Sequence, residues 1–266
     1  MNRENLKELL DEKLEKYNHP SFILNDPLSI PHRFRKKQDI EISGFFAAVL
    51  AWGNRVTIIK NCNRLMGLMN DSPYDFIINH SVIELKRFET FVHRTFNSTD
   101  LLFIIKAFRD FYTEYESLES LFLPPYGEMT IRKGLENFYE KCFSLPYAPE
   151  RSKKHIATPA KKSACKRLNM YLRWMVRNDG KGVDLGIWTK IHPSQLICPL
   201  DVHVLRMANQ LGLLSIDKGN WNTAELLTTR LRELDVNDPV KYDLALFGMG
   251  IEKSLKLDIF VPVTLS

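Results

Sequence analysis

The chain has 266 residues, of which 44% are hydrophobic and 26% are charged, as in an ordinary globular protein with a sizeable core. The sequence contains no apolar run long enough to span a membrane, and its polar first residues do not resemble a signal peptide, so we expect no membrane partner. The 4 cysteines form no CxxC pair, which favours free thiols in a reducing cytoplasm over a disulfide framework.

The net charge of +5 is unevenly distributed along the chain. Residues 151–210 contain 12 Lys and Arg residues and only 3 acidic residues, a net charge of +9, and the remaining chain therefore carries −4. A basic segment in an otherwise acidic protein indicates a binding site for a polyanion such as a nucleic acid. The alternative is a solvated basic loop without a partner.

Hydrophobic periodicity predicts a mainly α protein, because strand-like alternation is hard to find anywhere in the chain. Asp39 begins the second predicted helix as a cap-like residue, and Asn222 could cap the helix near Thr223. Two proline-containing basic stretches, 26–39 and 146–159, are expected to be loops. The helices are expected at residues 3–17, 39–51, from 56, 73–79, 82–88, 98–115, 117–123, 128–143, 166–176, 202–211, from 223, and after Asp238-Pro239.

The expected organisation is a single domain, 1–266, with two lobes whose boundary lies near residues 145–160. The tail from Lys256 onward is apolar and β-branched and could form either a short strand or a packed extension.

In the stretch FVHRTFN, Arg94 lies among aromatic residues and could either stack on a base or form an ion pair in the core. The core role is the favoured interpretation.

Two residues that could carry chemistry stand at the starts of consecutive predicted helices, Lys166 and Asp201. A helix start favours a carboxylate, and the cationic neighbours of Lys166 would favour a neutral, nucleophilic amine. Taken singly, Asp201 is also an ordinary helix N-cap, and Lys166 an ordinary surface charge. A functional role for both becomes the favoured interpretation only when they are considered together with the residues around them.

The stretch PLDVHVLRMANQLGLL resembles the VDTHV-R-RLGL signature of the helix-hairpin-helix DNA glycosylase superfamily. The resemblance implies that Asp201 is the essential aspartate of that signature. In bifunctional members a nucleophilic lysine opens an upstream helix reading K-T-A-x-V-x-L, and CKRLNMYLRW places Lys166 at that point. The separation of 35 residues between Lys166 and Asp201 is most similar to the archaeal 8-oxoguanine glycosylases. The blocks AWGNR and HRTFN also resemble an uncharacterised bacterial family of unknown function.

The resemblance implies a two-lobed helical DNA-glycosylase-like fold with an atypical helix-hairpin-helix element. The implied function is a DNA repair glycosylase and AP lyase that excises an oxidised purine, such as 8-oxoguanine, through a lysine Schiff base. Its partner would be double-stranded DNA containing a damaged base, and the protein would act as a monomer without a metal or cofactor. The alternative is a non-catalytic DNA- or RNA-binding protein on the same fold.

Further site residues follow from the same resemblance. Trp52, Tyr242 and Asp243 would form the base pocket, with the Asp243 carboxylate accepting hydrogen bonds from the N–H groups of the purine. The residues expected to contact DNA are Asn54, Arg55, Lys161, Lys162, Arg167, His203 and Arg206.

The chain departs from the superfamily pattern in three respects. The hairpin before Lys166, TPAKKSACK, has no glycine, so Lys161 and Lys162 would have to bind phosphate by charge. The cysteines do not cluster near the C-terminus, so an iron–sulfur loop is not expected. A zinc site built from Cys198, Asp201 and His203 would lack a fourth ligand.

Overall fold

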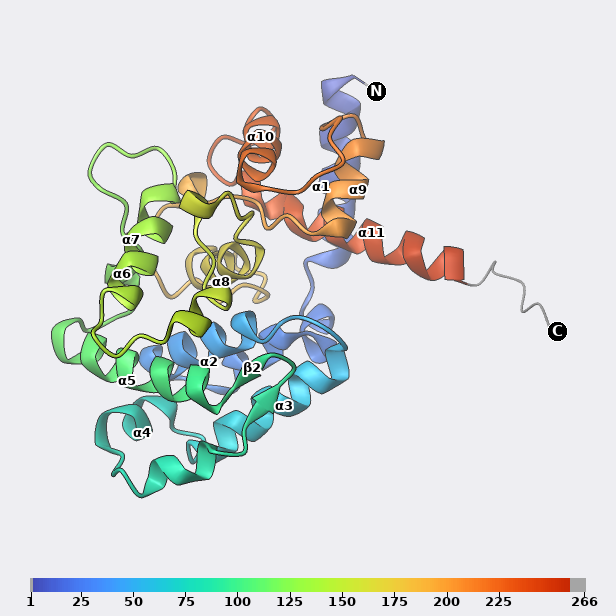
Figure 1. The fold of residues 1–266 in the computed structure, drawn as a ribbon. Coiled ribbons are helices and arrows are strands. Elements are labelled where there is room, and N and C mark those ends of the chain that lie inside the picture. The colour runs from blue at the N-terminus through green and yellow to red at the C-terminus, as the bar shows by residue number, and fades with distance from the viewer. Residues whose placement is uncertain (1, 259–266) are drawn as a thin grey trace.

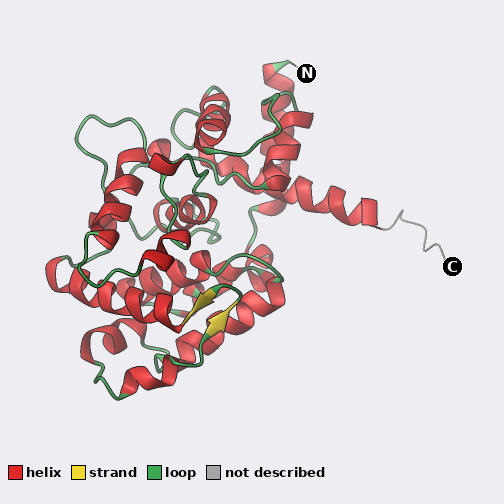
Figure 2. Cartoon of the chain, in the orientation of Figure 1, coloured by secondary structure: helices red, strands yellow, loops and turns green. Residues whose placement is uncertain are grey.

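The computed structural model describes residues 2–258, with side chains up to residue 252, and it is mainly helical, which confirms the expected fold class (Figure 2). Of the tail from Lys256 onward, residues 256–258 form the end of an α-helix and not a strand, and the rest lies outside the described residues. The α-helices are α1 Arg3–Tyr17, α2 Lys37–Val49, α3 Arg55–Leu68, α4 Pro73–Asn79, α5 Ser98–Glu114, α6 Glu119–Phe122, α7 Arg132–Phe143, α8 Lys166–Val176, α9 Val202–Gln210, α10 Trp221–Arg232 and α11 Tyr242–Asp258.

Short polar side chains begin several of these helices. The Asn97 side chain and Asp100 form a capping box at the start of α5. The predicted cap at Asn222 is wrong, because the Asn220 side chain accepts a hydrogen bond from the Thr223 N–H and α10 begins at Trp221. Asp39 is likewise not a cap: it lies in the first turn of α2, and its carboxylate accepts a hydrogen bond of 2.8 Å from the Tyr74 N–H.

Short 3-10 helices occupy much of the remaining chain, including parts of both predicted loops and the predicted helix at 82–88. Proline is the first residue of most of them, where its missing N–H costs no hydrogen bond. They are η1 Pro20–Asn25, η2 Pro27–Ser29, η3 Pro31–Arg33, η4 Glu84–Phe88, η5 Glu150–Lys154, η6 Pro159–Lys161, η7 Pro193–Gln195 and η8 Pro239–Lys241.

A small antiparallel hairpin, β1 Val92–His93 and β2 Phe96–Asn97, was not expected from the sequence. Val92 pairs with Asn97, and His93 pairs with Phe96. Strands of two residues are too short to produce a period-two hydrophobic pattern, which explains why no pattern in the sequence indicated them.

Helix α8 lies in the middle of the molecule, between a group formed by α1, α9, α10 and α11 and a group formed by α2 to α5 (Figure 1). It packs directly on α2. Gly44 of α2 permits this contact, because a Cβ there would lie 2.7 Å from the Met175 Cε of α8. The N-terminal helix α1 packs on α11, which also packs on α9, so the chain on both sides of residues 145–160 contributes to the first group.

The core between α2, α6, α7 and α8 is aromatic. The Tyr171 ring makes an edge contact with Phe45 at 5.7 Å between centroids and with Trp188 at 5.3 Å.

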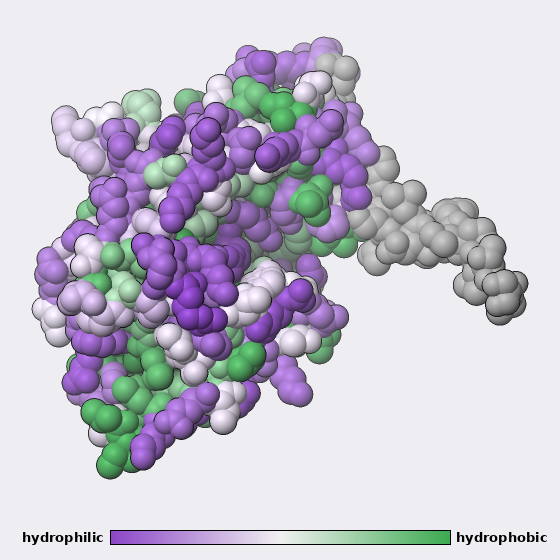
Figure 3. Space-filling model, in the orientation of Figure 1, coloured by the Kyte–Doolittle hydropathy of each residue, from purple (hydrophilic) through white to green (hydrophobic). Residues whose placement is uncertain are grey.

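Outside the core, hydrophilic residues cover most of the face drawn in Figure 3. Among the described residues, no helix has the length and apolar character needed to cross a membrane.

Candidate active site

Lys166 is the first residue of α8 and is held there by the chain before it. Lys162 and Cys165 both adopt left-handed backbone conformations, with φ of 59° and 49°, although neither is a glycine. These two turns bring the chain sharply into α8, whose apolar face is buried in the core. The Lys166 side chain remains 31% exposed at the helix start, where it can reach a ligand.

Asp201 is the N-cap of α9 and faces Lys166. Its Oδ1 accepts hydrogen bonds of 2.9 Å from the N–H groups of both His203 and Val204. Its Oδ2 lies 3.6 Å from the Lys166 Nζ. The amine and the carboxylate therefore come together although 35 residues separate them in sequence.

Both groups line one cavity of about 310 Å³, at the lower end of the ~300–1,000 Å³ typical of ligand pockets. Five chain segments meet there: 22–27, 51–58, 166–174, 199–204 and 243–247. The apolar part of its wall includes the rings of Phe22, Trp174 and Phe247. A flat, largely apolar ligand with polar edges would fit this combination of rings and charged groups.

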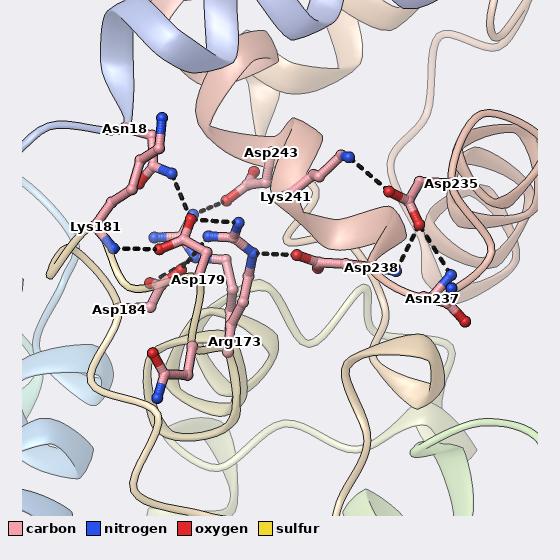
Figure 4. Close-up of polar contacts among 12 residues, drawn as sticks. Asn18, Arg173, Asp179, Lys181, Asp184, Asp235, Asn237, Asp238, Lys241 and Asp243 are labelled. Carbon is pink, nitrogen blue, oxygen red and sulfur yellow. Dashed lines mark hydrogen bonds and ion pairs between the residues drawn. The ribbon is translucent and has the colours of Figure 1, made fainter.

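Arg173 and Asp243, which both line the cavity, belong to a buried network of charged residues (Figure 4). The Arg173 guanidinium of α8 donates hydrogen bonds to Asp243 of α11 and, at 3.2 Å, to Asp184. One turn later, Arg177 pairs with Asp184 at 2.9 Å and with Asp238 at 2.8 Å. Because Arg173 belongs to α8 and Arg177 is its C-cap, this network connects α8 to α11 and to Asp238, which precedes α11.

Burial and ion pairing have opposite effects on the pKa of Asp243. Burial raises the pKa of Asp243 to about 6, and the neighbouring Arg173 opposes that rise. For Arg173 itself, Asp184 and Asp243 outweigh burial and raise the pKa above its usual range. Asp243 lines the cavity, but its Oδ2 is held by Arg173, and its Oδ1 lies 4.0 Å from the Cys198 Sγ.

Of the residues expected to contact DNA, some line the cavity and the others lie outside its wall. Arg55 and His203 line the cavity beside Lys166 and Asp201. Asn54 is exposed and caps α3, accepting a hydrogen bond of 3.2 Å from the Thr57 N–H. Arg206 donates to the Gly250 carbonyl at 2.7 Å, so it connects α9 to α11.

The basic residues around the start of α8 lie beside the first cavity, along a second hollow that Lys166 also lines. Lys162 is exposed on the edge of this hollow. Lys161 is exposed, but its Nζ donates to the Tyr139 hydroxyl at 2.7 Å. Arg167 also lines the hollow but donates to the backbone carbonyls of Val49 and His155, so it connects α8 to the end of α2.

Of the aromatic residues assigned to the base pocket, Trp52 lines the cavity, whereas Tyr242 is fully buried and outside the cavity wall. The expectation of a core role for Arg94 is wrong. Arg94 is exposed, and its guanidinium lies 4.7 Å from the centre of the Trp52 ring. Its left-handed backbone, with φ of 56°, turns it out of the hairpin, and His93 takes the buried position instead.

Two charged residues of the cavity wall were missed by reasoning from the sequence, Asp26 and Arg173. Asp26 precedes Pro27 at the start of η2, and its Oδ1 accepts a hydrogen bond of 3.0 Å from the Leu28 N–H. The Asp-Pro pair could have identified a helix start, but no local signal shows that this start faces α8. Arg173 occurs within the predicted α8 helix, and only its buried carboxylate partners distinguish it from a surface arginine.

Within the described chain, no three or more His, Cys, Asp or Glu side chains are grouped in a way that could hold a metal ion. Cys198, one residue of the zinc alternative, is fully buried, and burial raises its thiol pKa well above the usual value.

Comparison with known proteins yields one match. No curated protein and no solved structure is significantly similar to the chain. A family profile described as "Protein of unknown function (DUF2400)" matches residues 26–252, which include every residue that lines the cavity apart from Phe22. The chain therefore belongs to the DUF2400 family.

Proposed function

We propose that the protein is a DNA glycosylase with AP lyase activity, which removes an oxidised purine such as 8-oxoguanine from double-stranded DNA. The observation that carries this proposal is the approach of the Lys166 Nζ to the Asp201 Oδ2, 3.6 Å apart on the wall of one cavity. Excision requires a pocket for an extruded nucleotide, an anion beside the sugar and a nucleophile for its anomeric carbon. The cavity, Asp201 and Lys166 supply these three in one place.

In the proposed reaction, the glycosidic C1′–N bond breaks and its electron pair leaves with the base, which takes a proton from solvent. The positive charge that develops on the sugar lies beside the Asp201 carboxylate. The Lys166 ammonium first gives a proton to solvent, and the resulting amine bonds to C1′ and loses a second proton. The sugar ring then opens as the C1′–O4′ bond breaks and O4′ takes a proton from solvent, which leaves a protonated imine between C1′ and Nζ. Loss of a C2′ proton then expels the 3′ phosphate and cuts the strand.

The surroundings of the cavity support DNA as the substrate. The exposed Arg55 lines the cavity, and the exposed Lys162 lines the neighbouring hollow. Val202, which lines the cavity, and Val56, which follows Arg55 in the chain, are large apolar side chains that are 74% and 76% exposed. Exposed apolar side chains beside cations are what proteins insert between base steps when they open a duplex. In this proposal the protein works as a monomer in the cytoplasm.

The test is borohydride trapping on a panel of duplexes that each contain one damaged base. Borohydride reduces the imine to a stable amine, so the wild-type protein should form a covalent adduct, with 8-oxoguanine among the best substrates. Lys166→Ala should form none, and Asp201→Asn should reduce the yield by about 100-fold or more. Lys86→Ala, which removes an exposed lysine of η4, is the matched control and should react like the wild type.

The absence of an adduct across the whole panel would overturn the proposal. Binding of the same duplexes that is sensitive to salt and unchanged in Lys166→Gln and Asp201→Asn would then identify a non-catalytic DNA- or RNA-binding protein.

A further inference from the structure

Asp26 is a largely buried acidic residue that lines the cavity. The side chain is only 9% exposed, and its Oδ1 is engaged by the Leu28 N–H at 3.0 Å. Its Oδ2 has no hydrogen bond or ion pair with any residue in the described part of the chain, although Asp26 lines the cavity. One oxygen of this largely buried carboxylate therefore has no protein donor, and a bound ligand that donates an N–H could complete its hydrogen bonding.

The other two carboxylates of the cavity are already occupied. Asp201 caps α9 and faces Lys166, and Asp243 is held by Arg173. Opposite these three acids the cavity has three cations, Lys166, Arg173 and Arg55, so its formal charges balance. A balanced cavity with aromatic walls suits a neutral, flat ligand better than an anion.

We propose that Asp26 is the residue that selects the base, accepting hydrogen bonds from the adjacent N1–H and N2–H groups of a guanine-type lesion. This inference rests on the proposed glycosylase function and transfers the acceptor role from Asp243 to Asp26. Guanine and its oxidised forms present two neighbouring donors on the Watson–Crick edge. Adenine and cytosine present a ring acceptor there, and thymine flanks its one donor with two carbonyls, which a carboxylate would repel.

Comparison of two substrates separates base selection from the rest of the reaction. A duplex with 8-oxoguanine requires recognition of the base, whereas a duplex with a preformed abasic site requires only Lys166 and the sugar. Asp26→Asn keeps the size of the side chain and an oxygen for the Leu28 N–H, but it can turn an N–H₂ group toward the donors of the base. It should slow 8-oxoguanine excision by about 10- to 100-fold and leave cleavage of the abasic duplex within about twofold of wild type.

Two controls accompany this measurement. Asp217→Asn changes an exposed aspartate and should leave both rates unchanged. Asp26→Ser retains a capping oxygen and removes the second oxygen, so it should show the same selective loss if Asp26→Asn does not fold. Thermal melting of each variant verifies folding.

The outcomes are distinguishable. Excision of 8-oxoguanine by both folded Asp26 variants at the wild-type rate would overturn the role of Asp26 and leave the glycosylase function intact. An equal loss of rate on the abasic duplex would also overturn it, because Asp26 would then contribute to the reaction at the sugar and not to recognition of the base. A wild-type protein inactive on both duplexes would refute the proposed function, and the inference with it.

Discussion

Asp243 is a residue at which burial and ion pairing compete, and the balance can be measured as a function of pH. Its pKa is about 6 in the folded protein, compared with an ordinary value of 3.8. Because the folded state binds the proton more tightly than the unfolded state, the stability that this difference contributes is present below pH 3.8 and is lost as the pH rises through 6.

Asp243→Asn should reveal this loss. The variant has no carboxyl proton to lose, so the stability of the wild type relative to the variant should be greater at pH 4 than at pH 7, by up to about 3 kcal/mol. Urea unfolding at both pH values measures the difference, and Asp217→Asn controls for the loss of one carboxylate. A wild-type advantage that is equal at both pH values would mean that Arg173 fully offsets the burial of Asp243.

At the scale of the helices, hydrophobic spacing predicted most of the fold. The pattern located α1, which buries Leu10 and Leu14, and the start of α8, which is buried on every side from Tyr171 to Val176. Asp201 was identified as the start of α9 and is its N-cap. Spacing did not show that Asp39 would bond to a distant backbone N–H at Tyr74, or that Asn220 and not Asn222 would cap α10. Those choices depend on tertiary contacts, which no local pattern contains.

The candidate site was only partly accessible from the sequence for the same reason. The family resemblance pointed to Lys166 and Asp201 as a pair. A sequence motif of that kind does not predict which other residues line the cavity around the pair. Arg167 and Arg206 were expected to contact DNA, yet both donate to backbone carbonyls inside the protein. A basic residue in a motif can therefore hold the motif in place instead of contacting a ligand.

Asp201 caps α9 and has a proposed role in the reaction, and a pair of variants separates the two. Asp201→Asn retains the capping oxygen and removes the negative charge, whereas Asp201→Ala removes both. Asp201→Ala should lower the free energy of unfolding by about 1 kcal/mol and Asp201→Asn by a few tenths, while both lose the catalytic activity. Urea unfolding and the trapping yield provide the two measurements. Full activity in Asp201→Asn would show that the charge has no part in the reaction.

At the scale of the whole molecule, much of the basic charge of residues 151–210 is neutralised within the protein. Arg173 and Arg177 are buried against aspartates, Arg151 pairs with the buried Asp100, and Lys181 pairs with Glu15. The charge left for a polyanion is therefore smaller than +9 and is concentrated near the start of α8, where Lys162 is exposed.

This concentration predicts how binding to undamaged duplex DNA depends on salt. If Lys162 contacts a phosphate, Lys162→Gln should reduce the slope of log K against log salt concentration by about 0.9. Lys86→Gln removes the same charge from η4 and should leave the slope unchanged. Fluorescence anisotropy at salt concentrations from about 50 to about 200 mM measures both slopes. Equal slopes in the wild type and Lys162→Gln would place the DNA elsewhere on the surface.

The site of covalent attachment tests the central claim most directly. After borohydride reduction on 8-oxoguanine duplex and digestion of both protein and DNA, mass spectrometry locates the sugar remnant on one peptide. We predict that the remnant is attached to the Nζ of Lys166. A remnant on Lys161, Lys162 or any other amine would contradict the assignment of Lys166 as the nucleophile beside Asp201.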